Sequence, residues 1–545
     1  MKSRIFLSAL LCLWGVGAWA QTERPNQASH QLEIRRTLNE VRLDGVLDEP
    51  DWQQTPVATD FWEKDPRDGI LAERQTEARV MYDDQFLYVG IICYDDSTRH
   101  VIQNLKRDVD YFDGDAVAIL LDPMNEASNG FMFGVNPEGV QMEALLAGSS
   151  GDGNYNENWD NIWFAEATVS PDRWIVEMAI PFTTLRFNPT AKTWGLNFLR
   201  NDIKHNQFHV WAPVPRQFWG IDLGYAGQLL WDNPPPGAGS NISLIPYING
   251  AASQTFEEGK ANASQSNFDA GIDAKIAITS SLNLDLTVNP DFSQVDVDVQ
   301  QTNLTRFDLF FPERRNFFLE NSDLFANFGI PPVRPFFSRR IGLSEDGSPI
   351  PVRYGARLTG NLNENLRIGI MDVQTAGATQ TDPGQNYLTV AATHRIWDRS
   401  SLRAMFINRQ ELGGEGADNK NYTRNLDLEF NYQSADGTWQ GWSTYHHSFR
   451  HGITDEQGYW NTGFAYTKPN FNGLVDIVTV QDNYFADVGF VNRVENYDAE
   501  RDTVIRKGYH IVFVPLNLTL LPKVDWLQNL NFYWKMLFSS IATRA

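Results

Sequence analysis

The sequence predicts an all-β protein in which a β-sandwich precedes an antiparallel β-barrel of the membrane type. Residues 31–232 contain short strand-like runs separated by turn residues, as in a sandwich. Residues 241–545 contain longer runs in which apolar and polar side chains alternate, as in barrel strands. Aromatic residues make up 13% of the chain, and both architectures use them, in cores and at membrane interfaces.

The first 20 residues have the features of a secretory signal peptide. Two basic residues precede an apolar run from Ile5 to Trp14, and an Ala-Trp-Ala sequence ends at Ala20. We expect export with cleavage after Ala20. Cys12 lies inside the apolar run, so Cys93 is the one cysteine of the mature chain and cannot form an intramolecular disulfide.

The formal charge of −23 argues against nucleic acid as a partner, because a phosphate-binding surface needs an excess of basic residues. After the signal region, no run approaches the roughly 18 apolar residues that a membrane helix requires. A membrane β-barrel remains possible, since its alternating strands have no such run.

The strand pattern of residues 31–232 is clearest in a predicted hairpin, Thr76–Tyr82 and Gln85–Tyr94. Asn136–Gly139 reads as a turn in which the proline fixes φ and the glycine takes the last corner. Residues 233–240, rich in Pro and Gly, are predicted to be a linker.

In the barrel region Leu426 and Leu428 alternate with Asp427 and Glu429. Alternation alone would also fit a soluble sandwich, but the export signal, the serial hairpins and the aromatics near strand ends favour a membrane barrel. Candidates for the aromatic girdles are Trp439, Trp442, Tyr445, Tyr459, Trp460, Tyr466, Tyr533 and Trp534. The final residues lack the terminal aromatic that usually ends such barrels, so we expect a truncated barrel or an unusual closure.

Residues 289–340 interrupt the alternation and are dense in Phe, Arg and acidic side chains. So many exposed Phe residues would form an aggregation-prone apolar patch, so most of them should be buried. The Arg residues need carboxylate or carbonyl partners. The interior of a barrel can provide both burial and such partners, so this plug-like insert is expected to fill the barrel partly. The alternative is an ordinary structured loop.

Several motifs resemble the family-9 carbohydrate-binding modules. They are D-G-V-L-D-E-P-D-W, Y-D-D-Q-F-L-Y-V-G, D-G-D-A-V-A-I-L-L-D-P, W-I-V-E-M-A-I-P-F and W-G-L-N-F-L-R, in the family's order over residues 35–230. The resemblance implies a β-sandwich and carbohydrate binding, although related sandwiches bind haem or have no known ligand.

A second set of motifs, P-D-F-S-Q-V, R-F-D-L-F-F-P-E-R-R-N-F-F-L-E-N and F-F-S-R-R-I-G, lies in residues 240–540. It resembles an uncharacterised family of Gram-negative outer-membrane proteins, in which a family-9-like sandwich precedes a large β-barrel. The resemblance implies a cell outer-membrane location, with the sandwich in the periplasm.

Sugar binding needs an exposed aromatic face flanked by groups that bond to hydroxyls. Trp159 and Trp219 lie in polar contexts and are the candidate stacking residues, with Asn136, Gln141 and Arg200 as candidate hydroxyl partners. The alternative for each tryptophan is a place in the sandwich core.

Calcium binding needs clustered carboxylates on loops, and Asp113 and Asp115 are the candidate ligands within an acidic loop. The alternative is a solvated acidic loop, and no cofactor is expected beyond a structural calcium ion. Glycoside hydrolysis needs two carboxyl groups across a cleft, and Glu157 with Asp160 could be written as such a pair.

These features predict an exported outer-membrane protein that binds carbohydrate through its sandwich and is anchored by its barrel, or passes ligand through it. The expected partners are a glycan and outer-membrane lipid. One alternative is an O-glycosyl hydrolase of carbohydrate catabolism. Another is a structural or assembly protein whose sandwich binds no ligand.

Overall fold

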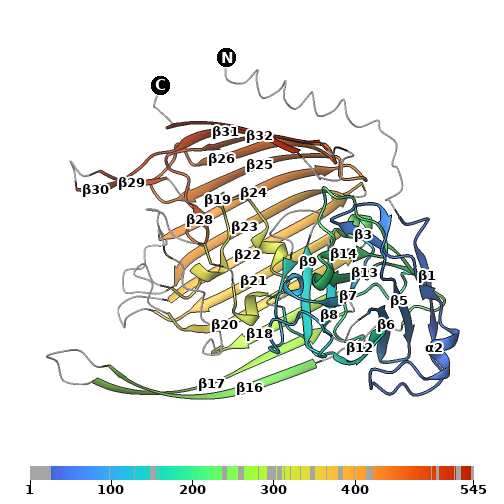
Figure 1. Ribbon diagram of the computed structural model, residues 1–545. Coiled ribbons are helices and arrows are strands. Elements are labelled where there is room, and N and C mark those ends of the chain that lie inside the picture. Colours follow the sequence, from blue (N-terminus) through green and yellow to red (C-terminus); the bar gives the residue numbers. More distant parts are fainter. Residues whose placement is uncertain are drawn as a thin grey trace.

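The computed structural model confirms the all-β prediction, with a sandwich followed by a barrel-type sheet (Figure 1). It describes residues 26–541 except 97–98, 128, 148–154, 158, 236–241, 256–262, 280, 291–301, 303–309, 312, 320, 332, 344–349, 364, 378–383, 398, 413–420, 492–493, 499–501, 521 and 523–529. The predicted signal peptide and most of the predicted linker lie outside the described residues. None of the described helices is both long and apolar enough to cross a bilayer.

Among the described residues between 31 and 231, the N-terminal sandwich contains fifteen strands, one α-helix and three 3-10 helices. These are β1 (Gln31–Arg36), α2 (Pro50–Gln54), β2 (Val57–Ala58), β3 (Trp62–Asp65), β4 (Ile70–Leu71), β5 (Thr76–Tyr82), β6 (Phe86–Tyr94), η2 (Tyr111–Asp113), β7 (Ala116–Asp122), β8 (Asn129–Val135), β9 (Gln141–Ala147), β10 (Tyr155–Asn156), β11 (Phe164–Ser170), β12 (Arg173–Pro181), β13 (Thr193–Asp202), η3 (Ile203–His205), β14 (Gln207–Val210), η4 (Leu223–Tyr225) and β15 (Gly227–Trp231).

Strand β1 joins the two sheets of the sandwich. Its first four residues pair in parallel with β15, and Arg35 and Arg36 then pair in parallel with β5. The strand path is therefore continuous, in the order β10-β9-β8-β7-β13-β15-β1-β5-β6-β12-β11. Apolar side chains from both sheets interdigitate between them, including the fully buried rings of Phe133, Trp174 and Trp194.

A buried carboxylate ties the N-terminal loop to the sandwich. Glu177 of β12 accepts hydrogen bonds from the backbone N–H groups of Asp44 and Gly45 (3.0 and 3.2 Å) and from the indole Nε1 of Trp52 (3.2 Å). Burial nevertheless raises the pKa of Glu177 to about 7, because removal from water penalises the carboxylate more than these donors stabilise it.

The pKa of Glu177 predicts a pH-dependent stability. The folded state binds the proton more tightly than the unfolded state, so the contribution is complete below about pH 4.5 and is lost as the pH rises through 7. Glu177→Gln should remove this dependence. The melting temperature of the variant should therefore rise relative to the parent between pH 4.5 and 8, and a constant difference across that range would contradict the assignment.

The C-terminal sheet contains thirteen antiparallel strands in the order β16-β17-β18-β20-β21-β22-β23-β24-β25-β26-β27-β31-β32. Its strands are β16 (Ile242–Thr255), β17 (Ala263–Ala277), β18 (Leu282–Val288), β20 (Val352–Asn363), β21 (Leu366–Thr375), β22 (Gly384–Ile396), β23 (Ser400–Leu412), β24 (Tyr422–Gln433), β25 (Trp439–Arg450), β26 (Gly458–Lys468), β27 (Phe471–Val480), β31 (Tyr509–Leu520) and β32 (Leu530–Ile541). In the described part of the chain, β16 and β32 are its two edges and no pairing closes the sheet.

The two faces of this sheet are inverted relative to those of a soluble protein. On β24, Leu426 and Leu428 are 38% and 48% exposed, whereas Asp427 and Glu429 between them are 0% and 6% exposed. Other strands follow the same rule, with polar groups on the covered face, such as Asp285, Thr359, Thr389, His446 and Asn461. This is the arrangement of a barrel with an apolar exterior and a polar interior.

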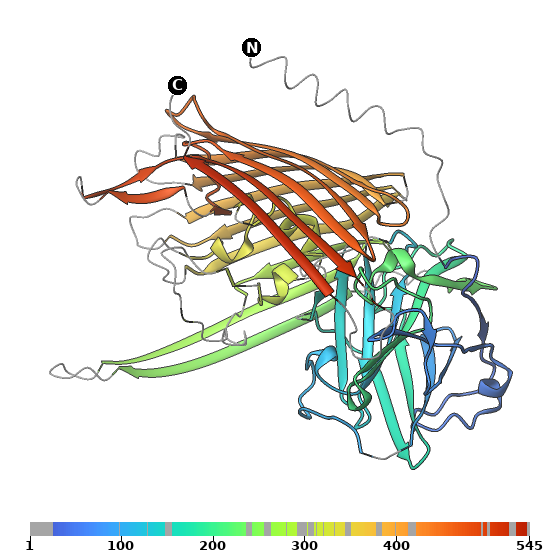
Figure 2. The same ribbon diagram turned by 45° about the horizontal axis from the view of Figure 1, so that its top comes forward.

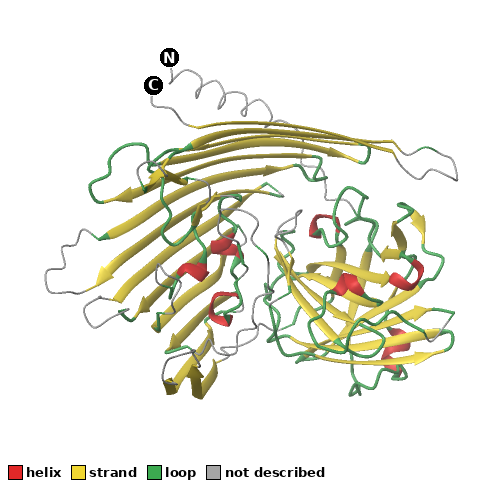
Figure 3. Cartoon of the chain, turned by 60° about the vertical axis from the view of Figure 1, so that its left-hand side comes forward, coloured by secondary structure: helices red, strands yellow, loops and turns green. Residues whose placement is uncertain are grey.

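The plug-like insert packs against the polar face of the sheet, as predicted. It contains α3 (Asn316–Leu319), α4 (Asp323–Ala326), β19 (Val333–Arg334) and η5 (Ser338–Arg340). Figure 3 shows the short helices of this region on the concave side of the sheet. Asn321 Nδ2 donates to Thr359 Oγ1 (2.6 Å), and the backbone N–H of Gly329 donates to Glu429 Oε1 (2.6 Å).

A second segment, between β27 and β31, also reaches the insert. It contains β28 (Phe490–Val491), β29 (Glu495–Asp498) and β30 (Thr503–Arg506), and β28 pairs with β19. The interior of the sheet is therefore filled by two separate parts of the chain.

The sandwich lies at one end of the barrel strands (Figure 2) and is joined there by a buried ion pair. Arg399, in the turn between β22 and β23, approaches both carboxylate oxygens of Asp222 (2.8 and 3.2 Å), and both side chains are almost completely buried. Tyr225 donates its hydroxyl to the backbone oxygen of Asp436 (2.6 Å) in the turn between β24 and β25. Gly224 is required here, because a Cβ would lie 2.3 Å from Cζ of Arg399.

This junction predicts a large coupling between two residues 177 positions apart. Asp222→Asn or Arg399→Gln alone leaves a buried unpaired charge and should cost about 3–5 kcal/mol, whereas the double variant should cost less than the sum. Thermal unfolding of the full chain in detergent micelles measures the loss of stability in the two single variants and in the double variant. Additive costs would show that the two groups do not interact.

Candidate functional site

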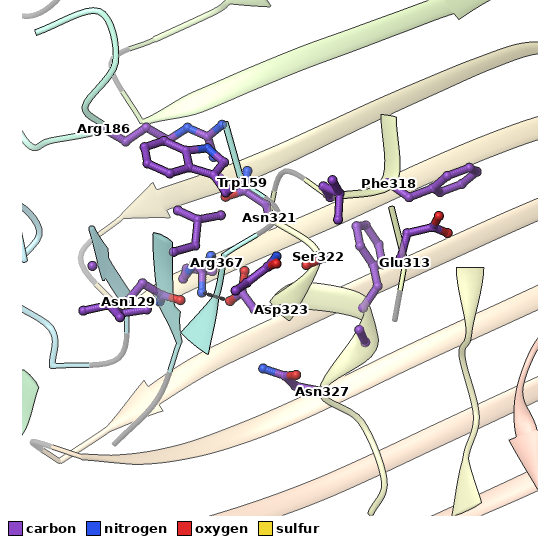
Figure 4. Close-up of a pocket in the computed structure, with 18 of the residues that line it drawn as sticks. Asn129, Trp159, Arg186, Glu313, Phe318, Asn321, Ser322, Asp323, Asn327 and Arg367 are labelled. Atoms are coloured by element: carbon purple, nitrogen blue, oxygen red, sulfur yellow. Dashed lines mark hydrogen bonds and ion pairs between the residues drawn. The ribbon is translucent and has the colours of Figure 1, made fainter. Parts of the chain in front are cut away.

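A cavity of about 340 Å³ lies where the sandwich meets the plug-like insert (Figure 4). Its volume is within the usual range for small-molecule sites. Sandwich residues between 123 and 186 form one wall, and the insert together with β20 and β21 forms the other. Its aromatic lining residues are Phe131, Tyr155 and Trp159 from the sandwich and Phe310, Phe318, Phe325, Phe336 and Phe337 from the insert.

Trp159 is the sequence-predicted stacking residue that lines this cavity. It follows the short strand β10, and its ring packs against Phe131 (5.3 Å between centroids) and Phe133 (5.9 Å). With 5% of its surface exposed, it belongs to the sandwich core as well. The core therefore fixes the ring, and only a small part of it borders the cavity.

Polar side chains of the cavity wall are paired with one another across structural elements. Arg367 of β21 binds Asp323 of α4 (2.7 Å), as Figure 4 shows. Asn361 Nδ2 of β20 donates to Glu126 Oε1 of the sandwich (3.2 Å). Together with Asn129, Asn321 and Ser322, these groups supply donors and acceptors for hydroxyls.

The second predicted stacking residue lies elsewhere. Trp219 is 42% exposed, its ring contacts Phe112 (5.8 Å between centroids), and it does not line the cavity. The structure therefore does not place Trp159 and Trp219 around the same described cavity.

The three predicted hydroxyl partners are occupied within the sandwich. Asn136 Oδ1 accepts from the backbone N–H groups of Glu138 and Val140 (3.0 Å each), which makes it a turn-stabilising side chain. Gln141 Nε2 donates to the backbone oxygen of Trp163 (3.0 Å).

Arg200 is 1% exposed and links the two sheets. Its Nη1 donates to the backbone oxygen of Tyr94 (3.0 Å), and its Nη2 lies 3.4 Å from Asp202 and 3.6 Å from Asp95. None of Asn136, Gln141 and Arg200 lines the cavity.

The two predicted calcium ligands have different environments. Asp113 is exposed, whereas Asp115 is buried and accepts from the backbone N–H groups of Val101 (2.8 Å) and Lys204 (3.1 Å). Among the described residues, the group whose ligand atoms lie within 4.8 Å of one another is Asp95, Asp96 and His205. Lys204 Nζ lies 2.7 Å from Asp95 and Arg74 lies 2.8 Å from Asp96, so cations of the chain already neutralise these carboxylates.

The carboxylates suggested for hydrolysis are on the surface. Asp160 pairs with Arg107 (3.2 Å), and Glu157 is exposed. Partial desolvation and the nearby carboxylate of Asp110 raise the pKa of Glu157. Glu143 could not be recognised from the sequence. It is fully buried beside Trp163 Nε1 (3.0 Å) and Arg107, and burial raises its pKa to about 7. Its oxygens are occupied by these donors and by the backbone N–H of Asn161 (3.2 Å), so it stabilises the loop before β11.

The cavity residues other than Trp159 were not identified as site residues from the sequence. Residues from 123–186, the insert and β20–β21 meet only in the folded chain, so no local motif contains them. The available signal was the Phe and Arg content of the insert, which indicated burial but no site.

Family models match one segment in each half of the chain. Residues 43–214 match the model described as carbohydrate family 9 binding domain-like. The N-terminal sandwich is therefore similar to the domains of that family. Residues 240–364 match a domain of unknown function (DUF5916), which covers β16–β20 and the insert. Both matches agree with the resemblances found in the sequence.

Solved structures give similarities at low identity. A family 9 carbohydrate-binding module from Caldicellulosiruptor kristjanssonii in complex with cellotriose is 15% identical, over 37% of this chain and 94% of that one (TM-score 0.27). A carbohydrate-binding protein from Bacteroides uniformis is 13% identical, over 37% and 99% (TM-score 0.31). Acinetobacter baumannii OccAB4 is 9% identical, over 89% and 90% (TM-score 0.25). No curated protein matches the chain.

Proposed function

We propose that the protein is an outer-membrane glycan-binding protein whose barrel holds it in the membrane and whose sandwich binds a saccharide at the barrel mouth. The observation that carries this proposal is the cavity between a carbohydrate-binding-like sandwich and the plug-like insert, with Trp159 in its wall. Aromatic rings stack on the C–H face of a sugar, and the surrounding amide, carboxylate and guanidinium groups bond to its hydroxyls.

The inverted faces of the C-terminal sheet support a membrane location. Water would penalise the exposed rows of Leu, Ile, Val and Phe on these strands, whereas hydrocarbon would not. The predicted signal peptide, residues 1–20, would direct the chain across the inner membrane.

The lengths of the connections support a periplasmic sandwich. The sandwich contacts the end of the sheet with short turns, residues 397–399 and 434–438. The opposite end has longer connections at residues 376–383, 413–421 and 481–508, although the connection of residues 521–529 at the sandwich end is also long. Outer-membrane barrels have short turns on the periplasmic side and longer loops outside. A ligand in the cavity would then meet the insert on its way through the barrel, so passage would require the insert to move.

The membrane location predicts the effect of one outward charge. Leu428→Arg places a cation on the apolar face of β24 and should destabilise the inserted barrel by up to about 2–4 kcal/mol. Refolding into phospholipid vesicles, followed by heat-dependent electrophoretic mobility, should show reduced insertion. Leu38→Arg, at an exposed sandwich position, is the matched control and should insert normally. Equal insertion of both variants would argue against the membrane role of this face.

The binding site predicts different effects for the two tryptophans. Trp159→Phe keeps an aromatic in the core but reduces the stacking face, and an aromatic contact of about 0.5–1.5 kcal/mol implies a loss of roughly 3–10-fold in saccharide affinity. Trp219→Ala should leave the affinity unchanged. Isothermal titration of the full chain in detergent with a panel of oligosaccharides measures both, with melting temperatures as the folding control. A loss of affinity in Trp219→Ala, with no loss in Trp159→Phe, would instead indicate that the saccharide binds at the exposed surface around Trp219.

A further inference from the structure

The cavity contains a guanidinium group with no carboxylate partner. Arg334 of β19 lines the cavity, and its Nη1 donates to the backbone oxygen of Ala326 (3.0 Å). Its Cζ lies 5.1 Å from the ring centroid of Phe310. Among the described residues no acidic side chain pairs with it, and its buried Nε has no hydrogen-bond partner. Burial lowers the pKa of Arg334, as expected for a desolvated cation without a counterion.

A second lining residue, Arg357 of β20, is paired with a carboxylate but has an unused hydrogen-bond donor. Its side chain is 1% exposed, and its Nε and Nη2 both donate to Asp285 Oδ2 (3.2 and 2.7 Å). In the described part of the chain, its remaining nitrogen, Nη1, is buried without a hydrogen-bond partner. One edge of this guanidinium fork is therefore available to an acceptor in the cavity.

A third cation enters the cavity wall from the sandwich. Arg186 lies within electrostatic range of Arg357 and Arg367, and of Asp285 and Asp323, and burial lowers its pKa to about 10. Figure 4 shows it on the sandwich side of the cavity, together with Trp159.

Two of the acidic lining residues are engaged by other cations. Glu313 accepts from Arg315 Nε and Nη2 (2.9 and 2.8 Å) and from Ser338 Oγ (2.6 Å). Asp323 is held by Arg367. A third acidic lining residue, Glu126, accepts from Asn361 Nδ2 (3.2 Å). In the described part of the chain, Arg334 therefore keeps its charge without a paired carboxylate.

We propose that the cavity selects saccharides that carry a carboxylate, as uronic acids do, over neutral saccharides. This inference rests on the proposed glycan-binding function and specifies its ligand class. A guanidinium binds a carboxylate through two parallel N–H···O bonds, and such charge-assisted bonds are stronger than those to hydroxyls. A neutral sugar would leave the charge of Arg334 desolvated without an anion, which is costly in a site shielded from water. The carboxylate would lie on the Arg334 side, with the sugar ring against the aromatic wall.

The test compares a uronic-acid oligosaccharide with its neutral counterpart of the same length and linkage, in which each carboxylate is reduced to an alcohol. Isothermal titration uses the full chain in detergent micelles. The acidic ligand should bind roughly 10-fold or more tightly than the neutral one. Arg334→Gln should bring this ratio close to one by weakening only the acidic ligand, and Arg334→Lys should retain part of it. Arg42→Gln, at an exposed position of the sandwich, is the matched control and should keep the ratio.

The outcomes separate this inference from the function on which it rests. Equal affinity for the acidic and neutral ligands, or an equal loss of both in Arg334→Gln, overturns the preference for carboxylates and leaves glycan binding in place. Binding of neither ligand overturns both. A sulfated oligosaccharide that binds more tightly than the uronic-acid ligand overturns the carboxylate assignment in favour of sulfate.

Discussion

The rest of the structure depends on the inversion of the C-terminal sheet, in which carboxylates, hydroxyls and guanidinium groups point inward and aliphatic side chains point outward. Because the inward groups are polar, an apolar core cannot form against them. The segment that occupies the interior must therefore pair their hydrogen-bonding groups and charges as well as fill the space. The plug-like insert does this through side chains that combine both properties. Arg403 lies 4.2 Å from the ring centroid of Phe328, and Arg357 lies 5.3 Å from that of Phe317. Sheet cations thus contact insert rings while their polar edges bind carboxylates.

The insert in turn creates the surface that the sandwich meets. Its aromatic residues continue the apolar wall begun by Phe131 and Trp159, so the cavity exists only when both parts are present. The buried pair of Asp222 and Arg399 and the hydroxyl of Tyr225 hold the sandwich against the short turns. A sandwich fixed in this way has the cavity on the side that faces the barrel interior.

The sequence was sufficient for the features that depend on local pattern. The alternation of apolar and polar residues around Leu426–Phe430 predicted a strand with two different faces. The mixture of Phe and Arg in the insert predicted that this segment is buried. Both features are present in the structure. The parallel pairings of β1 with β15 and β5 were not predicted, because they join residues far apart in the chain. Trp159 was predicted to lie in a polar loop, but the pattern could not show whether its ring belongs to a site or to the core. The structure places the ring in the core, with a small part of it bordering the cavity. Arg200 has the residue type of a sugar ligand, but its partners include Tyr94 and Asp95 at the end of β6, which lie more than 100 residues away in the chain.

The strands on either side of the insert, β18 and β20, are direct neighbours in register, with Leu282 opposite Gly360 and Val288 opposite Tyr354. The ladder of backbone hydrogen bonds between them is complete without anything that lies between residues 289 and 351. The plug-like insert is thus an insertion between two strands that pair directly with each other. Its length and sequence could change in evolution without altering the pairing of the sheet. Such changes would alter which ligands the cavity accepts while the fold stays the same.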